Sequence, residues 1–290
     1  LFGEGAGADL STGEHNVAVG YHALYQGTTE TDDNVAIGYN AMSGAWTTAA
    51  VNDCVVIGSG AGAGALVAGA SGAVAVGTSA LAALTAGTGN TAVGHQAGQA
   101  LTIGEWNTAV GYNALFTEDV GDHSTAIGIS ALYYQNSDSN NENAYNTGVG
   151  FYAGLWNVTG QNNTYLGANA GVGAESQSNS GNTGVGSNAL FAINDGNNNT
   201  AIGHRSGQAI AGGDENTFLG DYSGASSTAV VGAVAIGYNC ASAVMTTGAN
   251  YTISIGHGAL VGLTTGAQNI GIGRDALSNL TAGGYNTALG

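Results

Sequence analysis

The sequence predicts an all-β fold, a parallel β-solenoid of about 16 coils with a basic repeat of 17 residues. The motif N-T-A-V-G occurs at residues 90–94 and again, 17 residues later, at 107–111. Sixteen copies of this motif align on their last glycine, and no two successive copies lie closer than 17 residues. A fixed minimum length with longer exceptions is typical of solenoid coils, whose insertions extend a loop and leave the core unchanged. The aligned glycines, which define position 0 of each coil, are Gly20, Gly38, Gly58, Gly77, Gly94, Gly111, Gly128, Gly150, Gly167, Gly186, Gly203, Gly220, Gly237, Gly256, Gly273 and Gly290.

The residues just before position 0 predict a strand in every coil. Position −1 is Val, Ile or Leu in all copies, and position −3 is Thr, Val or Ile. Such residues favour strands, and their spacing of two places both side chains on one side. We therefore expect stacked coils to bury a continuous Val/Ile/Leu column. Position −4 is mostly Asn, which indicates either a ladder of stacked amides or a residue that tolerates a turn.

A second glycine recurs at position +10 of most 17-residue units, as at Gly87, Gly104 and Gly196. Two glycines in each unit suggest two sharp corners at which the backbone dihedrals require glycine. The sequence therefore predicts two short strands in each coil.

Position −2 is usually Ala or Gly and, by strand alternation, is expected to face away from the −1/−3 column. A solvent-facing column has no reason to stay small, whereas a column against another chain does. The pattern therefore predicts a homotrimer whose axis lies near Ala92, Ala109, Ala126 and Ala201.

The bulkiest residues at position −2 occur together with glycine at position +4, which is elsewhere often Leu. We interpret this exchange as two positions that share one interchain space of constant volume. The pairs are Val56 with Gly62, Tyr165 with Gly171, and Phe218 with Gly224.

The charge of the chain limits the kinds of molecule that it is expected to bind. The net charge is −17, and the only basic residues are Arg205 and Arg274. Nucleic acid and anionic membranes are recognised through clustered Lys and Arg, so neither is expected as a partner. The uncharged stretch 54–104 lacks the roughly 20 strongly apolar residues of a membrane span.

The domain organisation predicted from the repeats is simple. Residues 1–15 form a lead-in segment, and residues 16–290 form a single solenoid array. Because the chain ends on the repeat motif itself, we expect it to be a segment of a longer protein.

No arrangement of residues indicates catalysis or a bound cofactor, so the chain is not expected to be an enzyme. Asp32 with Asp33, and Asp119 with Asp122, could hold a divalent cation, although solvated loop acids are the simpler interpretation. The two cysteines are expected to lie ten coils apart, too far to form a disulfide.

The motifs N-V-A-V-G-Y-H-A-L (16–24), N-V-A-I-G-Y-N-A-M (34–42) and N-T-A-V-G-Y-N-A-L (107–115) resemble two repeat families. One is the N-T-A-x-G-Y-x-A-L array of phage tail fibres, and the other is the head repeat of trimeric autotransporter adhesins. The resemblance implies a left-handed β-roll in which three chains surround one axis of an extracellular fibre. The function it implies is non-enzymatic attachment, by a tail fibre on the virion or by a bacterial adhesin head. The tail fibre, whose 17-residue period is the closer match, would bind a glycan or protein of the bacterial surface.

Ice binding is a further alternative, because Thr at −3 with Val at −1 is similar to the regular Thr arrays of ice-binding solenoids. That function requires both columns to face water. Position −1 is never polar and five copies carry Val at −3, so the sequence favours buried columns instead.

Overall fold

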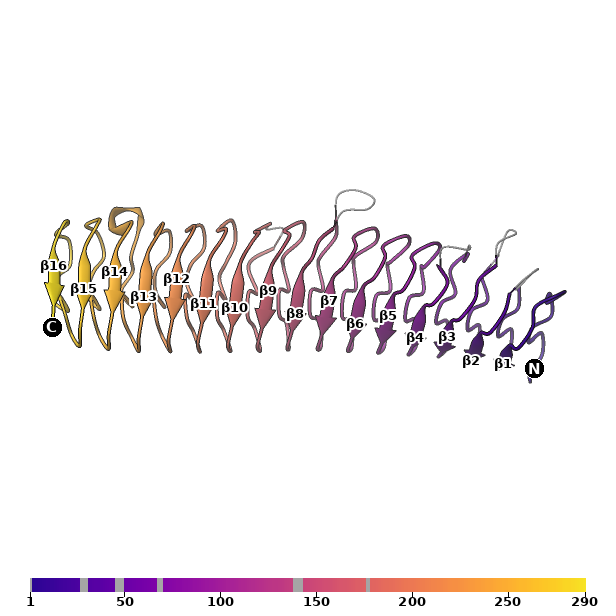
Figure 1. The fold of residues 1–290 in the computed structure, drawn as a ribbon. Helices are drawn as coiled ribbons and strands as arrows, with labels where there is room; N and C mark the ends of the chain where they lie inside the picture. The colour runs from indigo at the N-terminus through magenta and orange to yellow at the C-terminus, as the bar shows by residue number, and fades with distance from the viewer. Residues whose placement is uncertain (1, 27–30, 45–49, 67–69, 138–142, 176–177) are drawn as a thin grey trace. The chain divides into compact units, whose positions relative to one another are not determined.

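The computed structural model describes residues 2–26, 31–44, 50–66, 70–137, 143–175 and 178–290. The chain divides into two compact units, Leu1–Asn146 and Thr147–Gly290, and each is a parallel β-solenoid. The described part of the chain contains no α-helix, and the one 3₁₀ turn described in full is η2 (Thr247–Ala249). The predicted all-β solenoid with its 17-residue coil is therefore confirmed (Figure 1).

Each coil contributes one three-residue strand at positions −3 to −1, and successive strands within a unit pair in parallel. The first unit contains β1 (Val17–Val19), β2 (Val35–Ile37), β3 (Val55–Ile57), β4 (Val74–Val76), β5 (Thr91–Val93), β6 (Thr108–Val110) and β7 (Thr125–Ile127). The second contains β8 (Thr147–Val149), β9 (Thr164–Leu166), β10 (Thr183–Val185), β11 (Thr200–Ile202), β12 (Thr217–Leu219), β13 (Val234–Ile236), β14 (Ile253–Ile255), β15 (Ile270–Ile272) and β16 (Thr287–Leu289).

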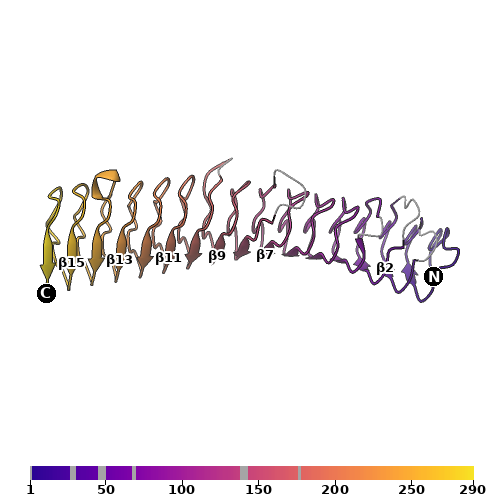
Figure 2. The same ribbon diagram turned by 45° about the horizontal axis from the view of Figure 1, so that its top comes forward.

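The prediction of a second strand in each coil is wrong. The far side of the coil is a series of turns, seen in Figure 2 as loops opposite the arrows. Residues at positions +2, +4 and +12 have left-handed backbones there, such as Gln96 (φ 56°), Leu115 (φ 52°) and Trp106 (φ 58°). This reversal sends amides alternately to the preceding and the following coil: Gln96 donates to Thr78 O at 2.9 Å, and Gly98 donates to Ala114 O at 2.9 Å. The alternation prevents a regular strand but leaves the amides paired.

The side chains of the strands point in the direction opposite to the predicted one. The middle residue, position −2, is buried in β1–β15, whereas the residues at −3 and −1 are partly exposed. Ala109 shares the coil interior with buried Ala and Leu side chains from the turns, so a small residue fits at position −2 where position +4 is Leu. The proposed axis residues are thus core residues of a single chain: Ala92, Ala109, Ala126 and Ala201 are 0–1% exposed.

Positions −2 and +4 do share one space, but this space lies inside the chain and not between chains. A Cβ added to Gly62 would meet Val56 at 3.2 Å, and one added to Gly224 would meet the Phe218 ring at 2.5 Å. Where position −2 is Ala, the same space holds a buried Leu such as Leu115. The exchange therefore keeps the packing of the core constant.

The asparagines at position −4 form the expected ladder of amides inside each unit. Asn107 is 1% exposed; its Oδ1 accepts the Ser124 N–H at 2.8 Å, and its Nδ2 donates to Gly121 O at 2.8 Å. In the second unit Asn216 Nδ2 donates to Asn199 Oδ1 at 2.8 Å. The side chain thus satisfies two backbone groups of the next coil, which explains why Asn recurs.

The two recurrent glycines have different physical causes. Gly111, at position 0, has φ 135°, and an added Cβ would meet Gly128 O at 2.5 Å. Gly104, at position +10, has no positive φ, but an added Cβ would collide with the carbonyl oxygen of Gly121 in the next coil. The prediction that dihedral angles require glycine at both corners is therefore wrong for most +10 glycines, where close stacking of the backbones excludes a side chain.

Residues 2–15 are not merely a lead-in, because they stack on the first coil. Phe2 forms a parallel bridge with Val19, and Gly3 (φ 130°) lies directly against the carbonyl of Gly20. Gly3 therefore occupies position 0 of one more coil.

Both cysteines are free and buried, and burial raises the pKa of the Cys54 and Cys240 thiols.

Candidate interaction surface

The outward side chains of positions −3 and −1 form an apolar surface on each unit, here called the sheet face. Neighbouring strands pair like with like, for example Thr108 with Thr125 and Val110 with Ile127. The aliphatic side chains are well exposed for their type: Val93 is 37% exposed, and Leu219 is 43% exposed. No residue of either column is charged in any copy. In the first unit, six steps of about 4.8 Å give this face a length of roughly 30 Å.

Aromatic residues recur at position +1, just beyond the position 0 glycines, although other coils carry Ser, Thr, Ala, Ile, Asp or Arg there. Tyr21 stacks on Tyr39 with ring centroids 5.3 Å apart, and His95 stacks on Tyr112 at 5.2 Å. Tyr238 and His257 form the same contact in the second unit at 5.3 Å. The stacked rings widen the apolar surface, and offset stacking favours such ring pairs.

Several acidic side chains have a structural role that the sequence did not reveal. Six residues before a position 0 glycine, a side chain accepts the backbone amide of the equivalent residue in the preceding coil. Asp32 Oδ1 accepts the Glu14 N–H at 2.7 Å, Asp122 Oδ1 accepts the Glu105 N–H at 2.6 Å, and Asp214 Oδ1 accepts the Asn197 N–H at 2.7 Å. Hydrogen bonds to ionised acceptors are stronger than neutral ones, so these acids join coils together.

Three of the four candidate cation ligands, Asp32, Asp33 and Asp122, have side-chain contacts with the protein itself. Asp32 and Asp122 accept backbone amides, and Asp33 lies 3.3 Å from His15 Nδ1. The backbone carbonyl of Asp119 accepts the Thr102 amide. Among the described residues, no three His, Cys, Asp or Glu side chains gather as a metal site.

Two exposed histidines of the second unit lie close to acids of the following coil. His204 Nδ1 lies 3.0 Å from Asp221 Oδ1, and His257 Nδ1 lies 3.8 Å from Asp275 Oδ1. Arg205 donates to the Tyr222 hydroxyl at 2.7 Å. These contacts are partly solvated pairs between coils, which contribute little individually to stability.

Among the described residues of the first unit, the carboxylate of Glu118 is fully buried. Glu118 stands at position +7, where several other coils carry Leu or Ile. Its two oxygens accept the Gly121 N–H at 2.8 Å and Gln135 Nε2 at 2.9 Å. Ser137 donates to the same carboxylate through its amide and its hydroxyl. Because its hydrogen bonds are satisfied within the core, we assign Glu118 a structural role.

Comparison with protein-family models and with curated protein sequences gives no match. Within the described residues, no helix has the length and apolar character needed to cross a membrane. The interpretation of the surface therefore depends on its geometry and chemistry. Sequence analysis identified the regular columns at positions −3 and −1, but it wrongly predicted that they form the core.

Proposed function

We propose that the chain is a segment of a non-enzymatic attachment fibre, most closely a phage tail fibre that binds a bacterial surface. The observation that carries the proposal is the sheet face, a long uncharged apolar surface on a chain with net charge −17. Soluble monomers rarely expose large contiguous apolar surfaces, which usually mark interaction sites. The sheet face is best suited to contact with identical copies.

Three copies around one axis would bury this face, as the resemblance to trimeric fibre repeats implies. The contact would join Val, Ile, Leu and Thr side chains of positions −3 and −1 and exclude the acids. Neighbouring strands present the same residue types at the same height, so each coil meets an equivalent coil. The acidic side chains of the three chains would then lie outside the contact, where water and salt screen their mutual repulsion.

A pair of charge substitutions tests the assembly. Val110 lies on the sheet face, whereas the exposed Asn136 lies outside it. Sedimentation velocity should show a trimer for the wild type and for Asn136→Arg, and a folded monomer for Val110→Arg. The circular dichroism spectrum should not change in either variant. A monomeric wild type, or a trimeric Val110→Arg, contradicts the proposal.

The head of a bacterial surface adhesin is the alternative of the same class and uses the same assembly. Both place the chain outside the cell. Retention of the purified protein on intact bacterial cells favours the tail fibre. Retention on animal-cell or matrix surfaces, without binding to bacteria, favours the adhesin.

Ice binding is a second candidate, because a specific observation favours it. The −3 and −1 columns face outward and not into the core, as ice binding requires. Nine of the −3 residues are Thr, and they repeat in constant register. A thermal hysteresis measurement separates the two functions. If the monomeric wild type shows hysteresis and Thr108→Lys abolishes it, ice binding is supported. If the wild type shows no hysteresis, the attachment fibre is the favoured function.

A further inference from the structure

Two tyrosines lie side by side at position +1 of successive coils in the first unit. The rings of Tyr21 and Tyr39 are stacked, with centroids 5.3 Å apart and planes inclined by 10°. The backbone fixes this contact, because Val19 and Ile37, two residues before them, are partners in the parallel sheet. Tyr21 also stacks on its neighbour His22 at 3.9 Å, so two ring contacts hold it. Tyr21 is 41% exposed and Tyr39 is 57% exposed, so solvent reaches both side chains.

The sulfur-containing side chains, which mild oxidants usually attack, are shielded in this chain. Both cysteines and both methionines are 0% exposed: Cys54, Cys240, Met42 and Met245. Oxidation of cysteine follows its exposure and its thiolate character, and burial raises the pKa of both thiols. An oxidant in solution therefore meets exposed aromatic rings before it meets sulfur. Because both cysteines are free, no disulfide joins the coils.

We infer that Tyr21 and Tyr39 are a site of oxidative cross-linking, at which a peroxidase with hydrogen peroxide joins the two rings as dityrosine. Each phenol O–H loses its hydrogen atom to the oxidant, and the two tyrosyl radicals combine through a carbon–carbon bond between positions ortho to the oxygens. The hydrogen on each of these carbons then moves to the oxygen of its own ring, which restores both aromatic rings. Two hydrogen atoms leave the protein, and they reduce one hydrogen peroxide to two waters.

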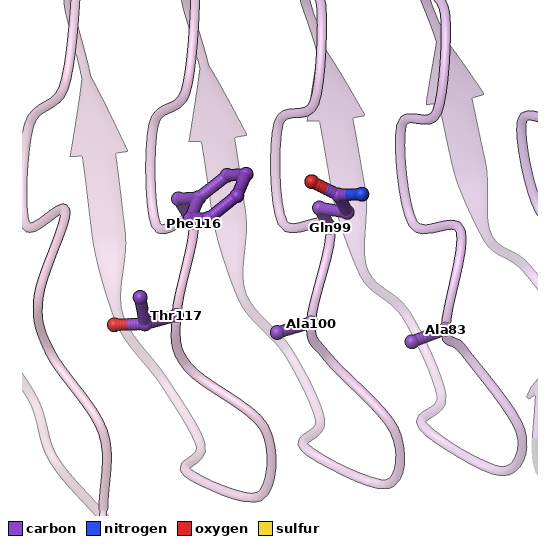
Figure 3. A pocket seen from close by; sticks show the side chains of 5 residues that line it. All are labelled: Ala83, Gln99, Ala100, Phe116 and Thr117. Atoms are coloured by element: carbon purple, nitrogen blue, oxygen red, sulfur yellow. The ribbon is translucent and has the colours of Figure 1, made fainter.

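The other tyrosine rings in these contacts are arranged differently. Tyr112 also stands at position +1, but the ring it stacks on is that of His95, at 5.2 Å. Tyr133 meets Tyr134 edge-on at 4.5 Å and stacks on Phe116, which lines an open recess on the turn side (Figure 3). Neither arrangement presents two tyrosine rings face to face.

The cross-link would add a covalent bond between the coils of β1 and β2. Successive coils are otherwise joined by hydrogen bonds and packing, which local unfolding can open. A bond across one coil restricts the unfolded chain and so favours the folded state. This site does not depend on what the fibre attaches to or on whether its copies assemble.

Mild oxidation of the full chain tests the site. The protein is treated with a plant peroxidase and hydrogen peroxide, and tandem mass spectrometry of its digest locates the cross-links. We expect a bond between Tyr21 and Tyr39, with dityrosine fluorescence, in chains that keep the mass of one chain on a denaturing gel. Tyr39→Phe should abolish that bond and most of the fluorescence, because phenylalanine has no phenol hydrogen to lose.

Tyr112→Phe is the matched control. It removes an exposed tyrosine (52%) at the same position of another coil, where the residues in the adjacent coils are His95 and Ile129. The cross-link and its fluorescence should remain as in the wild type. The circular dichroism spectrum should be the same in all variants.

His95→Tyr tests the geometry by rebuilding the pair elsewhere. The rings at 95 and 112 already lie 5.2 Å apart with planes inclined by 9°, so this variant should gain a second cross-link between them. The inference is overturned if the wild type forms no Tyr21–Tyr39 bond, if its cross-links join only separate chains, or if Tyr39→Phe keeps the full fluorescence. A folded His95→Tyr variant without a new bond would also contradict it, because the same stacking should react in the same way.

Discussion

At the scale of the residue, the molecule is built from side chains that serve the neighbouring coil. Asn107 accepts an amide of the next coil and donates to one of its carbonyls, and Asp122 accepts an amide of the preceding coil. Both are buried, at 1% and 6% exposure. Polar residues therefore hold the spacing between coils, while small apolar residues fill the interior.

Replacing Asn107 with Ala should lower the free energy of unfolding of the first unit by about 2–6 kcal/mol. The variant leaves the Ser124 amide and the Gly121 carbonyl buried without partners, at about 1–3 kcal/mol each. Urea denaturation measures the loss. Asn136→Ala, at an exposed position, should change stability by less than about 0.5 kcal/mol. Equal stability of the two variants would show that the ladder contributes nothing.

The shared space of positions −2 and +4 predicts a compensating pair. Phe218→Ala should cost about 3–5 kcal/mol through the cavity it creates. Gly224→Leu should cost about 1–3 kcal/mol or more, because its Cβ would meet the Phe218 ring at 2.5 Å. The double variant recreates the Ala/Leu combination of Ala109 with Leu115. It should be at least about 2 kcal/mol more stable than the sum of the two single changes predicts, as a double-mutant cycle would measure. Additive losses would contradict the shared space.

At the scale of the element, each coil is one short strand and a run of turns whose backbone reverses at fixed positions. The strands, their register and the amide ladder could be predicted from the sequence, because these follow from the period and from residue types with one clear role. Which side of a three-residue strand is inside could not be predicted. Thr108 and Val110 flank an Ala109 that would suit either a narrow core or a tight interface, so the pattern fits both orientations. The left-handed turns were also hidden, because Leu115 and Trp106 adopt φ values that their residue types rarely take.

Glycines of the coil differ in their tolerance of a side chain. Gly220→Ala should destabilise the second unit by at least about 2 kcal/mol, since Gly220 has φ 132° and its Cβ would meet Gly237 O at 2.5 Å. Gly212→Ala should stabilise it by about 0.4–1 kcal/mol, because nothing lies within 4 Å and its φ is not positive. Thermal unfolding followed by circular dichroism measures both. Two variants with the same midpoint would contradict this distinction.

At the scale of the whole molecule, an acidic chain carries an uncharged face. The net charge of −17 makes copies repel one another, whereas the sheet face gives them a surface to bury. The sequence prediction of a homotrimer was based on the small residues at position −2. Because the structure covers those residues within their own chain, the contact that we propose between copies uses the adjacent positions −3 and −1 instead.

Association should therefore strengthen with salt. Raising the ionic strength from about 20 mM to about 500 mM shortens the screening length from roughly 20 Å to below about 5 Å and weakens repulsion between the acids. Sedimentation equilibrium should show trimer formation at a chain concentration more than about tenfold lower in the high-salt buffer. Weaker association at high salt would indicate that ion pairs, and not the sheet face, join the copies.

The constant register of the coils also bears on how such a chain can change its length. Residues 94–110 begin at Gly94 and end at Val110, so their removal would join Val93 to Gly111 and recreate the junction found between Val110 and Gly111. The strands on either side, β5 and β7, present the same Thr-Ala-aliphatic pattern and would pair as β5 and β6 do now. Recombination between repeats of the gene can thus shorten or extend the protein in steps of one coil, and each product retains the same local bonds.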